Sequence, residues 1–225
     1  MSAEMSRPAR RRRVGILGGT FDPIHAGHLI LAEETRQYLS LDKAVLVPAG
    51  HPWRKADREI TPAGDRIAMV SLAIAANPAF ALSRLEVERE GATYTADTLH
   101  ELRMQLGGSA DLWFILGSDA LLDLQYWRDP KRIVAQVRLA VAARGPVSDL
   151  DLGGLEDLVP GVREKIDLVP MPPVGISSSE LRRRLRHGFT TRYWLPAEVE
   201  RYALDHNLYG RRRASGLGAT GSLGL

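Results

Sequence analysis

Short apolar runs alternate with helical patterns along most of this chain, and this alternation constrains the fold more than any other feature. Each run is four or five residues long, ends near turn residues and is typical of a strand buried on both faces. The runs occupy residues 14–17, 44–47, 112–116, 139–142 and 166–169. Helical patterns occupy residues 28–39, 62–77, 95–106, 177–186 and 196–206. The alternation predicts βαβ units, and therefore one α/β domain with a doubly wound, mostly parallel sheet.

Three local patterns predict further boundaries. Thr61 is expected to cap a helix whose first residue is Pro62. Alternating side chains predict a strand over residues 80–87. The sequence Ser-Ser-Ser-Glu at 177–180 predicts a capping box at the start of a later helix.

The charge of the chain is concentrated at its two ends. The 225 residues carry a net charge of +3, but residues 14–210 hold 22 basic and 26 acidic side chains. We therefore expect a basic N-terminal tail at 1–13, a folded domain at 14–210 and a low-complexity C-terminal tail at 211–225. A mildly acidic body argues against nucleic acid as the partner.

Composition excludes several classes of site and suggests a compartment. There is no cysteine, so structural disulfides and thiolate chemistry are excluded. No apolar run approaches the roughly 20 residues that a membrane helix needs, and no membrane partner is expected. These observations predict a soluble, cytoplasmic protein, and they leave a homo-oligomer open.

The strongest chemical signal is the loop that follows the first predicted strand. Gly18 and Gly19 allow a bulky anion to approach the backbone, and the N-terminus of the next helix favours phosphate there. His25 and His28 are three residues apart and can both turn toward that point. The alternative is that the histidines only cap the helix.

Other anion-binding and metal-binding motifs fit this loop poorly. Its glycines do not match the GxGxxG dinucleotide fingerprint, and no Gly-Lys-Ser/Thr follows as in a Walker loop. Zinc would need a third protein ligand beside the two histidines, and the motif lacks the glutamate of HExxH. We expect no metal site built from protein ligands.

Four motifs in order resemble the nucleotidylyltransferase superfamily, and in particular its nicotinate mononucleotide adenylyltransferase family. They read GGTFDPIHxGH at 18–28, SRxExxRxGxTYTxxTL at 83–99, FILGSDAL at 114–121 with Trp127, and ISSSxLR at 176–182. The first and last are shared across the superfamily, whereas the middle two point to this family. The resemblance spans residues 14–210 and implies a Rossmann-like fold.

The resemblance also implies a reaction in NAD biosynthesis. The 5′-phosphate of nicotinate mononucleotide would attack the α-phosphorus of ATP in line, giving the deamido dinucleotide and pyrophosphate. Mg²⁺ is expected on the ATP phosphates with few or no protein ligands. A phosphate nucleophile is already ionised near pH 7, because its second pKa is about 6, so no general base is required.

Family roles carry over to matching positions. Catalytic roles fall to His25, His28 and Arg182, which would contact and neutralise the phosphates. Ser177 and Ser178 would complete a second phosphate clamp at a helix N-terminus, and plain helix capping is the alternative for Ser177. The full ATP-binding set is Gly18, Gly19, Thr20, Phe21, His25, His28, Gly117, Asp119, Ile176, Ser177, Ser178 and Arg182.

The acceptor-binding set implied by the resemblance is Lys55, Thr93, Tyr94, Asp119 and Trp127. The backbone N–H groups of Thr93 and Tyr94 would meet the nicotinate carboxylate, and Trp127 would stack on the ring or act as a core aromatic. Asp119 would accept from ribose hydroxyls or cap the next helix. Around Lys55 the chain departs from the family, because residues 51–55 read HPWRK where PPHK is frequent.

Three other functions remain as alternatives. Phosphopantetheine adenylyltransferase shares the first motif, but residues 93–95 and Trp127 argue against it. A tRNA-synthetase-like fragment would need a KMSKS-type loop, which is missing. From a different class, the Arg-rich ends could make the chain a nucleic-acid-binding module.

Overall fold

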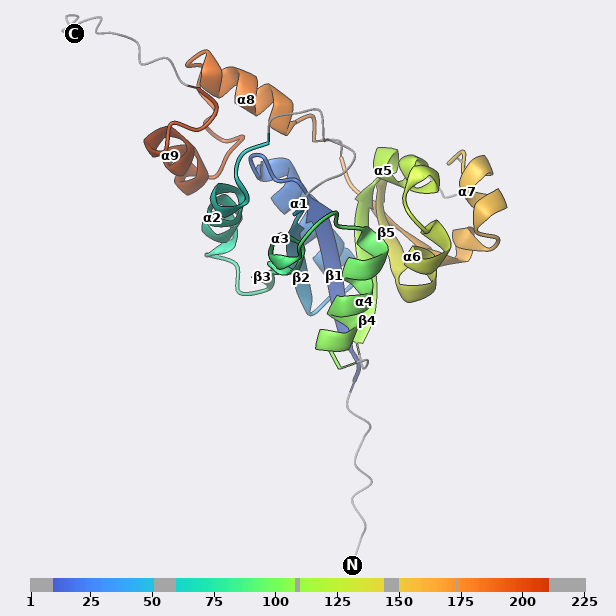
Figure 1. Ribbon diagram of the computed structural model, residues 1–225. Coiled ribbons are helices and arrows are strands. Elements are labelled where there is room, and N and C mark those ends of the chain that lie inside the picture. The colour runs from blue at the N-terminus through green and yellow to red at the C-terminus, as the bar shows by residue number, and fades with distance from the viewer. Residues whose placement is uncertain (1–9, 51–59, 108–109, 144–149, 173, 211–225) are drawn as a thin grey trace, which may run out of the picture.

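The strands form one parallel sheet in the order β3-β2-β1-β4-β5-β6 (Figure 1). The computed structural model describes residues 10–50, 60–107, 110–143, 150–172 and 174–210. Its strands are β1 Arg12–Gly19, β2 Lys43–Pro48, β3 Phe80–Leu82, β4 Ala110–Gly117, β5 Arg138–Ala143 and β6 Ile166–Pro170. The predicted doubly wound sheet is confirmed, and every strand pair is parallel.

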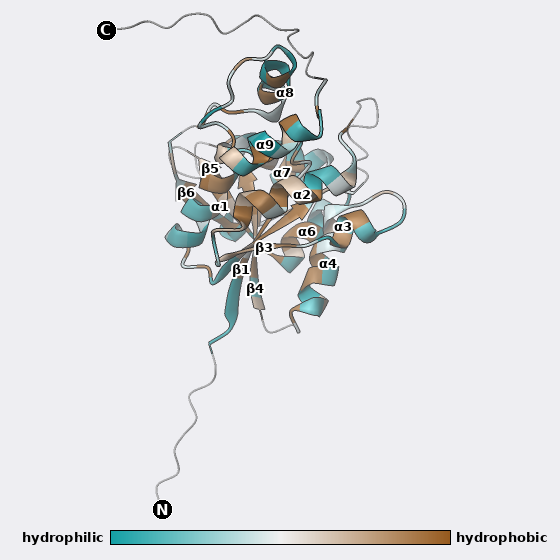
Figure 2. Cartoon of the chain, turned by 90° about the vertical axis from the view of Figure 1, so that its left-hand side faces the viewer, coloured by the Kyte–Doolittle hydropathy of each residue, from teal (hydrophilic) through white to brown (hydrophobic). Residues whose placement is uncertain are grey.

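Helices cover both faces of this sheet. Their bounds are α1 Ala26–Tyr38, α2 Ala63–Ile74, α3 Leu85–Glu88, α4 Thr95–Gln105, α5 Ser118–Asp123, α6 Pro130–Gln136, α7 Gly153–Leu158, α8 Ser178–Arg186 and α9 Ala197–Asp205, with 3₁₀ turns at Leu124–Tyr126 and Val162–Lys165. Both views place α8 and α9 beyond one end of the sheet, with α9 beside α2 (Figures 1 and 2). None of the described helices is long and apolar enough to cross a membrane.

The alternation of side chains along β4 divides the core into two halves. Leu112, Phe114 and Leu116 pack on one face with residues of α4 and α6. Trp113 and Ile115 pack on the other face with residues of α1, α2, α8 and α9. Because successive strand residues point to opposite faces, an unbroken apolar run fills both halves. The middle of the sheet is accordingly hydrophobic, whereas the start of β1 is hydrophilic (Figure 2).

The order of strands locates the crevice at which ligands bind in such folds. From β1 the chain first moves outward to β2 and β3, and then returns to place β4 on the other side of β1. This reversal puts the switch point between the carboxyl ends of β1 and β4. Gly19 and Gly117 are the last residues of these two strands.

Two predicted boundaries are wrong. Pro62, not Thr61, is the N-cap residue of α2, and no side chain caps this helix. The Thr61 backbone instead donates to Asp22 Oδ2 at 3.3 Å, so tertiary contacts hold the start of the helix. The strand predicted at 80–87 ends at Leu82, and residues 85–88 form α3. The predicted capping box of α8 is confirmed in its first half only, because Ser177 Oγ accepts from the Glu180 N–H while the Glu180 carboxylate pairs with Arg183.

Candidate active site

The loop between β1 and α1 turns sharply at Phe21. This residue has a left-handed backbone, with φ of 50°, and its ring is buried. The ring lies against Gly19, where an added Cβ would approach it to 3.0 Å. On its other side, the ring meets His28 edge to face, with centroids 5.0 Å apart. Gly19 is therefore needed for close packing as well as for access to the backbone.

His25 and His28 form a stacked pair at the start of α1. Their ring centroids are 3.7 Å apart, and the His25 N–H donates to His28 Nδ1 at 3.3 Å. Because Nδ1 of His28 accepts, the neutral ring carries its proton on Nε2, which is then a hydrogen-bond donor. His25 is the N-cap residue of α1. The helix-capping alternative and the phosphate-binding hypothesis are thus compatible.

The environment of His25 keeps its imidazole neutral. The residue is only 5% exposed, and within the described chain its Nδ1 has no hydrogen-bond partner. Burial lowers the pKa of His25 from 6.5 to about 4. At neutral pH this residue therefore brings no positive charge to the loop.

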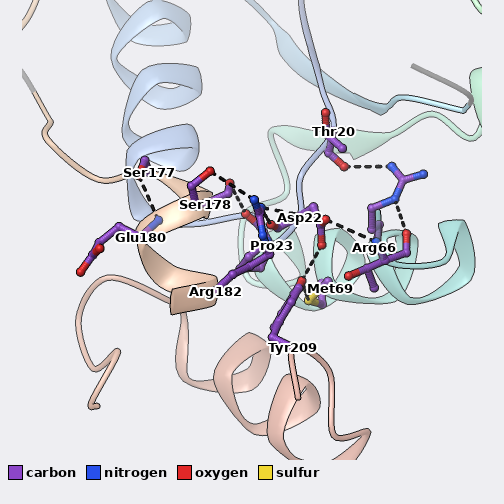
Figure 3. A network of polar contacts seen from close by, with 12 residues as sticks. Thr20, Asp22, Pro23, Arg66, Met69, Ser177, Ser178, Glu180, Arg182 and Tyr209 are labelled. Carbon is purple, nitrogen blue, oxygen red and sulfur yellow. Dashed lines mark hydrogen bonds and ion pairs between the residues drawn. The ribbon is translucent and has the colours of Figure 1, made fainter. Parts of the chain in front are cut away.

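The loop is held to α8 by two hydrogen bonds to its carbonyl oxygens (Figure 3). Arg182 Nη1 donates to the Asp22 carbonyl at 2.6 Å, and Ser178 Oγ donates to the Pro23 carbonyl at 2.9 Å. The other arm of Arg182 donates to Ser179 Oγ at 3.2 Å. These contacts bring the N-terminus of α8 to the glycine loop, although about 155 residues separate the two in sequence.

On the opposite side, the loop is held by Arg66 of α2. This arginine is 2% exposed and donates to the carbonyl oxygens of Thr20, Thr61 and Gly50, at 2.9, 2.9 and 3.4 Å. Burial lowers the pKa of its guanidinium. Asp22 is also buried, and its Oδ1 accepts from the hydroxyl of Tyr209 at 2.8 Å.

Three adjoining cavities lie over the carboxyl ends of the strands. The inner cavity, of about 380 Å³, contains the predicted acceptor residues Thr93, Tyr94 and Trp127. The loop cavity, of about 540 Å³, contains most of the predicted phosphate-binding residues, and the outer cavity is about 690 Å³. Thr20, His28, Leu31 and Gly117 line both the inner and the loop cavity, and Gly27, Leu31, Gly117, Asp119 and Val174 line both the loop and the outer cavity. The three cavities therefore lie next to one another along one cleft and share walls.

Trp127 forms one wall of the inner cavity. Its ring is edge to face with Phe114, with centroids 5.9 Å apart, and it packs against the core. Its buried indole N–H has no partner in the described part of the chain. The core-aromatic and ligand-stacking alternatives are thus both compatible with its position.

The inner cavity also contains charged side chains that carried no predicted role. The Arg128 guanidinium lies 4.3 Å from the centroid of the Tyr94 ring. Glu86 lines the same cavity and accepts from Thr98 Oγ1 at 2.8 Å. Arg128 is exposed, so its side chain can reorient to contact an anionic ligand at the mouth of the cavity.

Asp119 lies in the first turn of α5, facing both the loop and the outer cavity. The N-cap residue of α5 is Gly117, so the alternative in which Asp119 only caps this helix is wrong. Its carboxylate is therefore left for another partner on the cavity side.

The structure brings the predicted site residues together along the cleft, apart from Lys55, which lies outside the described residues. Sequence reasoning gave no role to Asp22, Arg66 or Tyr209. A signal existed for Arg66, since it shares a four-residue spacing with Val70 and Ile74 and so lies on the buried face of α2. The sequence around Tyr209 carries no comparable signal.

The parallel sheet, the glycine loop at its switch point and the histidine pair define a nucleotidyltransferase. Residues 16–184 match the model of the cytidylyltransferase-like family. In addition, 338 curated proteins match this chain significantly.

Two relatives show the family more narrowly. The protein of Dehalococcoides mccartyi strain CBDB1 is 44% identical over 200 residues, which is 89% of this chain and 98% of the relative. That of Thermomicrobium roseum is 45% identical over 197 residues, or 88% of this chain and 91% of the relative. Both are named "Probable nicotinate-nucleotide adenylyltransferase". The chain belongs to the nicotinate-nucleotide adenylyltransferase family.

Solved structures of low sequence identity share the fold. Nicotinic acid mononucleotide adenylyltransferase of Plasmodium falciparum, complexed with NaAD, superposes with a TM-score of 0.71 at 23% identity. The match covers 88% of this chain and 97% of that chain. A complex of the same protein with APC gives a TM-score of 0.69 over the same shares.

Burial of a neutral His25 makes stability depend on pH. Between pH 6.5 and about 4 the unfolded chain binds a proton at this position that the folded chain does not, so the free energy of unfolding falls as pH falls. From pH 7 to pH 5 the loss is on the order of 2 kcal/mol. Urea unfolding of the wild type and of His25→Asn at pH 7 and pH 5 measures this loss in the free energy of unfolding.

We expect the wild type to lose that much more stability than His25→Asn, because all other titrating groups are common to both proteins. Equal losses in the two proteins would contradict a neutral, buried His25.

Proposed function

We propose that this chain transfers the adenylyl group of ATP to nicotinate mononucleotide, giving nicotinate adenine dinucleotide and pyrophosphate. The observation that carries this proposal is a pair of adjoining cavities. The inner cavity, with an aromatic wall, shares Thr20, His28 and Gly117 with the glycine-loop cavity. Two substrates that must meet phosphate to phosphate need this arrangement. The same reaction fits the relatives named above.

The chemistry requires positioning and charge compensation. The acceptor phosphate attacks the α-phosphorus of ATP in line, the bond to the bridging oxygen breaks, and pyrophosphate leaves with the electron pair. The nucleophile is ionised near neutral pH and needs no base. The loop cavity supplies donors to the charge that develops on the leaving group.

His28 and Arg182 are the donors that we assign to this charge. The ring proton of neutral His28 lies on Nε2 because Nδ1 accepts from the backbone, and the ring lines both the inner and the loop cavity. Arg182 lines the loop cavity and adds a guanidinium beside the N-terminus of α8. His25, neutral and buried, orients His28 through its backbone N–H and through stacking.

We assign the nicotinate ring to the inner cavity. Trp127 offers an aromatic wall, and α4 begins at Thr95, directly after Thr93 and Tyr94. A carboxylate is favoured at a helix N-terminus, and the Arg128 guanidinium over Tyr94 adds positive charge nearby. These groups favour the acid over the amide mononucleotide.

We treat Mg²⁺ as part of the ATP substrate. This ion retains several waters and commonly binds through substrate phosphates. The part of the chain that the structure describes has no group of three His, Asp or Glu side chains placed to hold a metal. We assign Asp119 to ribose hydroxyls and Lys55 to the acceptor side.

Release of pyrophosphate from ATP and Mg²⁺ tests the proposal, with nicotinate mononucleotide, its amide and phosphopantetheine as parallel acceptors. We expect rapid release with the acid and little with the other two, because the inner cavity favours an aromatic carboxylate. Release with phosphopantetheine alone would show that phosphopantetheine, and not nicotinate mononucleotide, is the acceptor. If no pyrophosphate were released with any of the three acceptors, adenylyl transfer would be excluded and only nucleotide binding would remain.

His28→Ala tests the catalytic donor. We expect kcat to fall about 10²-fold or more, the scale of losing one charge-stabilising donor. The exposed histidine of α4, in His100→Ala, is the control and should retain the wild-type rate. A near-native rate in His28→Ala would remove His28 from the catalytic role.

Trp127→Ala tests the acceptor wall. Stacking of a base on an aromatic side chain contributes about 1–3 kcal/mol, so the KM for the mononucleotide should rise about tenfold. The KM for ATP should change much less, and Trp127→Phe should lie between the wild type and the alanine variant. Equal increases in both KM values would make Trp127 a packing residue.

A further inference from the structure

Asp22 is a buried carboxylate at the centre of the loop and is surrounded by donors from three segments. It is 4% exposed. Its Oδ1 accepts from the Tyr209 hydroxyl at 2.8 Å (Figure 3). Its Oδ2 accepts from the Thr61 N–H at 3.3 Å. Two cations lie close to it: the buried Arg66, whose charge interacts with Asp22, and Arg182, whose Nη1 is 4.0 Å from Oδ2.

Tyr209 is a permanent donor to this carboxylate. Burial and the neighbouring Asp22 raise the pKa of its phenol well above the usual value, so the hydroxyl keeps its proton. The phenol oxygen also lies 3.8 Å from Met69 Sδ of α2. Tyr209 follows α9 and is 187 residues from Asp22 in sequence.

Arg182 has two competing anions within reach. At present it donates to the Asp22 carbonyl oxygen, while its distance to the Asp22 carboxylate is longer than a hydrogen bond. Its other attractive partner is phosphate in the loop cavity, which it lines. A carboxylate oxygen left without a donor in this buried place would attract the guanidinium strongly, since charge-assisted pairs are the strongest hydrogen bonds.

We propose that Tyr209 is a positioning residue. Its hydroxyl donates to the Asp22 carboxylate and thereby keeps the Arg182 guanidinium available to the phosphates of ATP. This inference rests on the proposed function, because that function places the ATP phosphates in the loop cavity. Without the hydroxyl, Arg182 turns onto Asp22 and away from the nucleotide. The turn after α9 thus controls whether the Arg182 guanidinium faces the loop cavity.

Tyr209→Phe removes only this hydroxyl, and the loop retains its other supports. Arg66 still holds the Thr20 carbonyl oxygen, and Ser178 still holds that of Pro23. The chain also offers a matched control in Tyr202 of α9, whose hydroxyl donates to Asp65 Oδ1 at the same 2.8 Å. Tyr202→Phe breaks an equivalent bond to α2 away from the loop.

The experiment compares wild type, Tyr209→Phe and Tyr202→Phe by KM for both substrates, calorimetric affinity for a non-hydrolysable ATP analogue, and Tm. We expect Tyr209→Phe to raise the KM for ATP and weaken analogue binding about tenfold, with the KM for the mononucleotide unchanged within twofold. Tyr202→Phe should match the wild type in all three binding measurements. Equal effects of the two variants, or unchanged analogue binding in Tyr209→Phe, would overturn the inference.

A double variant separates positioning from mere stability. Asp22→Asn in the Tyr209→Phe background removes the charge that attracts Arg182, so analogue affinity should return toward the wild-type value. A further loss of affinity would overturn the inference. If the wild type released no pyrophosphate with any acceptor, the proposed function would fail, whereas analogue binding would still decide the role of Tyr209.

Discussion

The site depends on how the carbonyl oxygens of one loop are satisfied. Arg66, Arg182 and Ser178 donate to the carbonyls of Thr20, Asp22 and Pro23 from two different helices. Each oxygen would otherwise need water or would repel an approaching phosphate. Because α2 and α8 take these acceptors, the loop can present its cavity side to an anion.

The cationic and histidine side chains around the loop therefore have different roles. Arg66 is buried and donates only to backbone carbonyl oxygens among the described residues. Arg182 donates to one backbone carbonyl oxygen and also lines the loop cavity. His25 is neutral and buried, so His28 is the histidine whose ring lines both the inner and the loop cavity. This division limits the repulsion that several cations would suffer in an empty site.

Hydrophobic periodicity and contiguous motifs are local signals, so the sequence predicted the parallel sheet and most of the residues that line the cleft, but it gave no role to Glu86 or Arg128. It failed where a distant contact decided the outcome. Helix α2 begins after the N-cap residue Pro62 without a capping side chain, and Asp22 accepts from the N–H of Thr61 just before it. Tyr209 and Asp22 are far apart in sequence, and a single chain offers no pattern that pairs them. The sequence motif included Asp22, but its contacts emerge only from the fold.

The long separations within the loop network have a consequence for biosynthesis. Contacts to the loop come from residues 155, 160 and 187 positions further along the chain. During synthesis the β1 loop therefore leaves the ribosome well before its partners from α8 and the turn after α9. The first half of the sheet can form before then, but the complete set of contacts that holds the loop cannot form until residue 209 has been made.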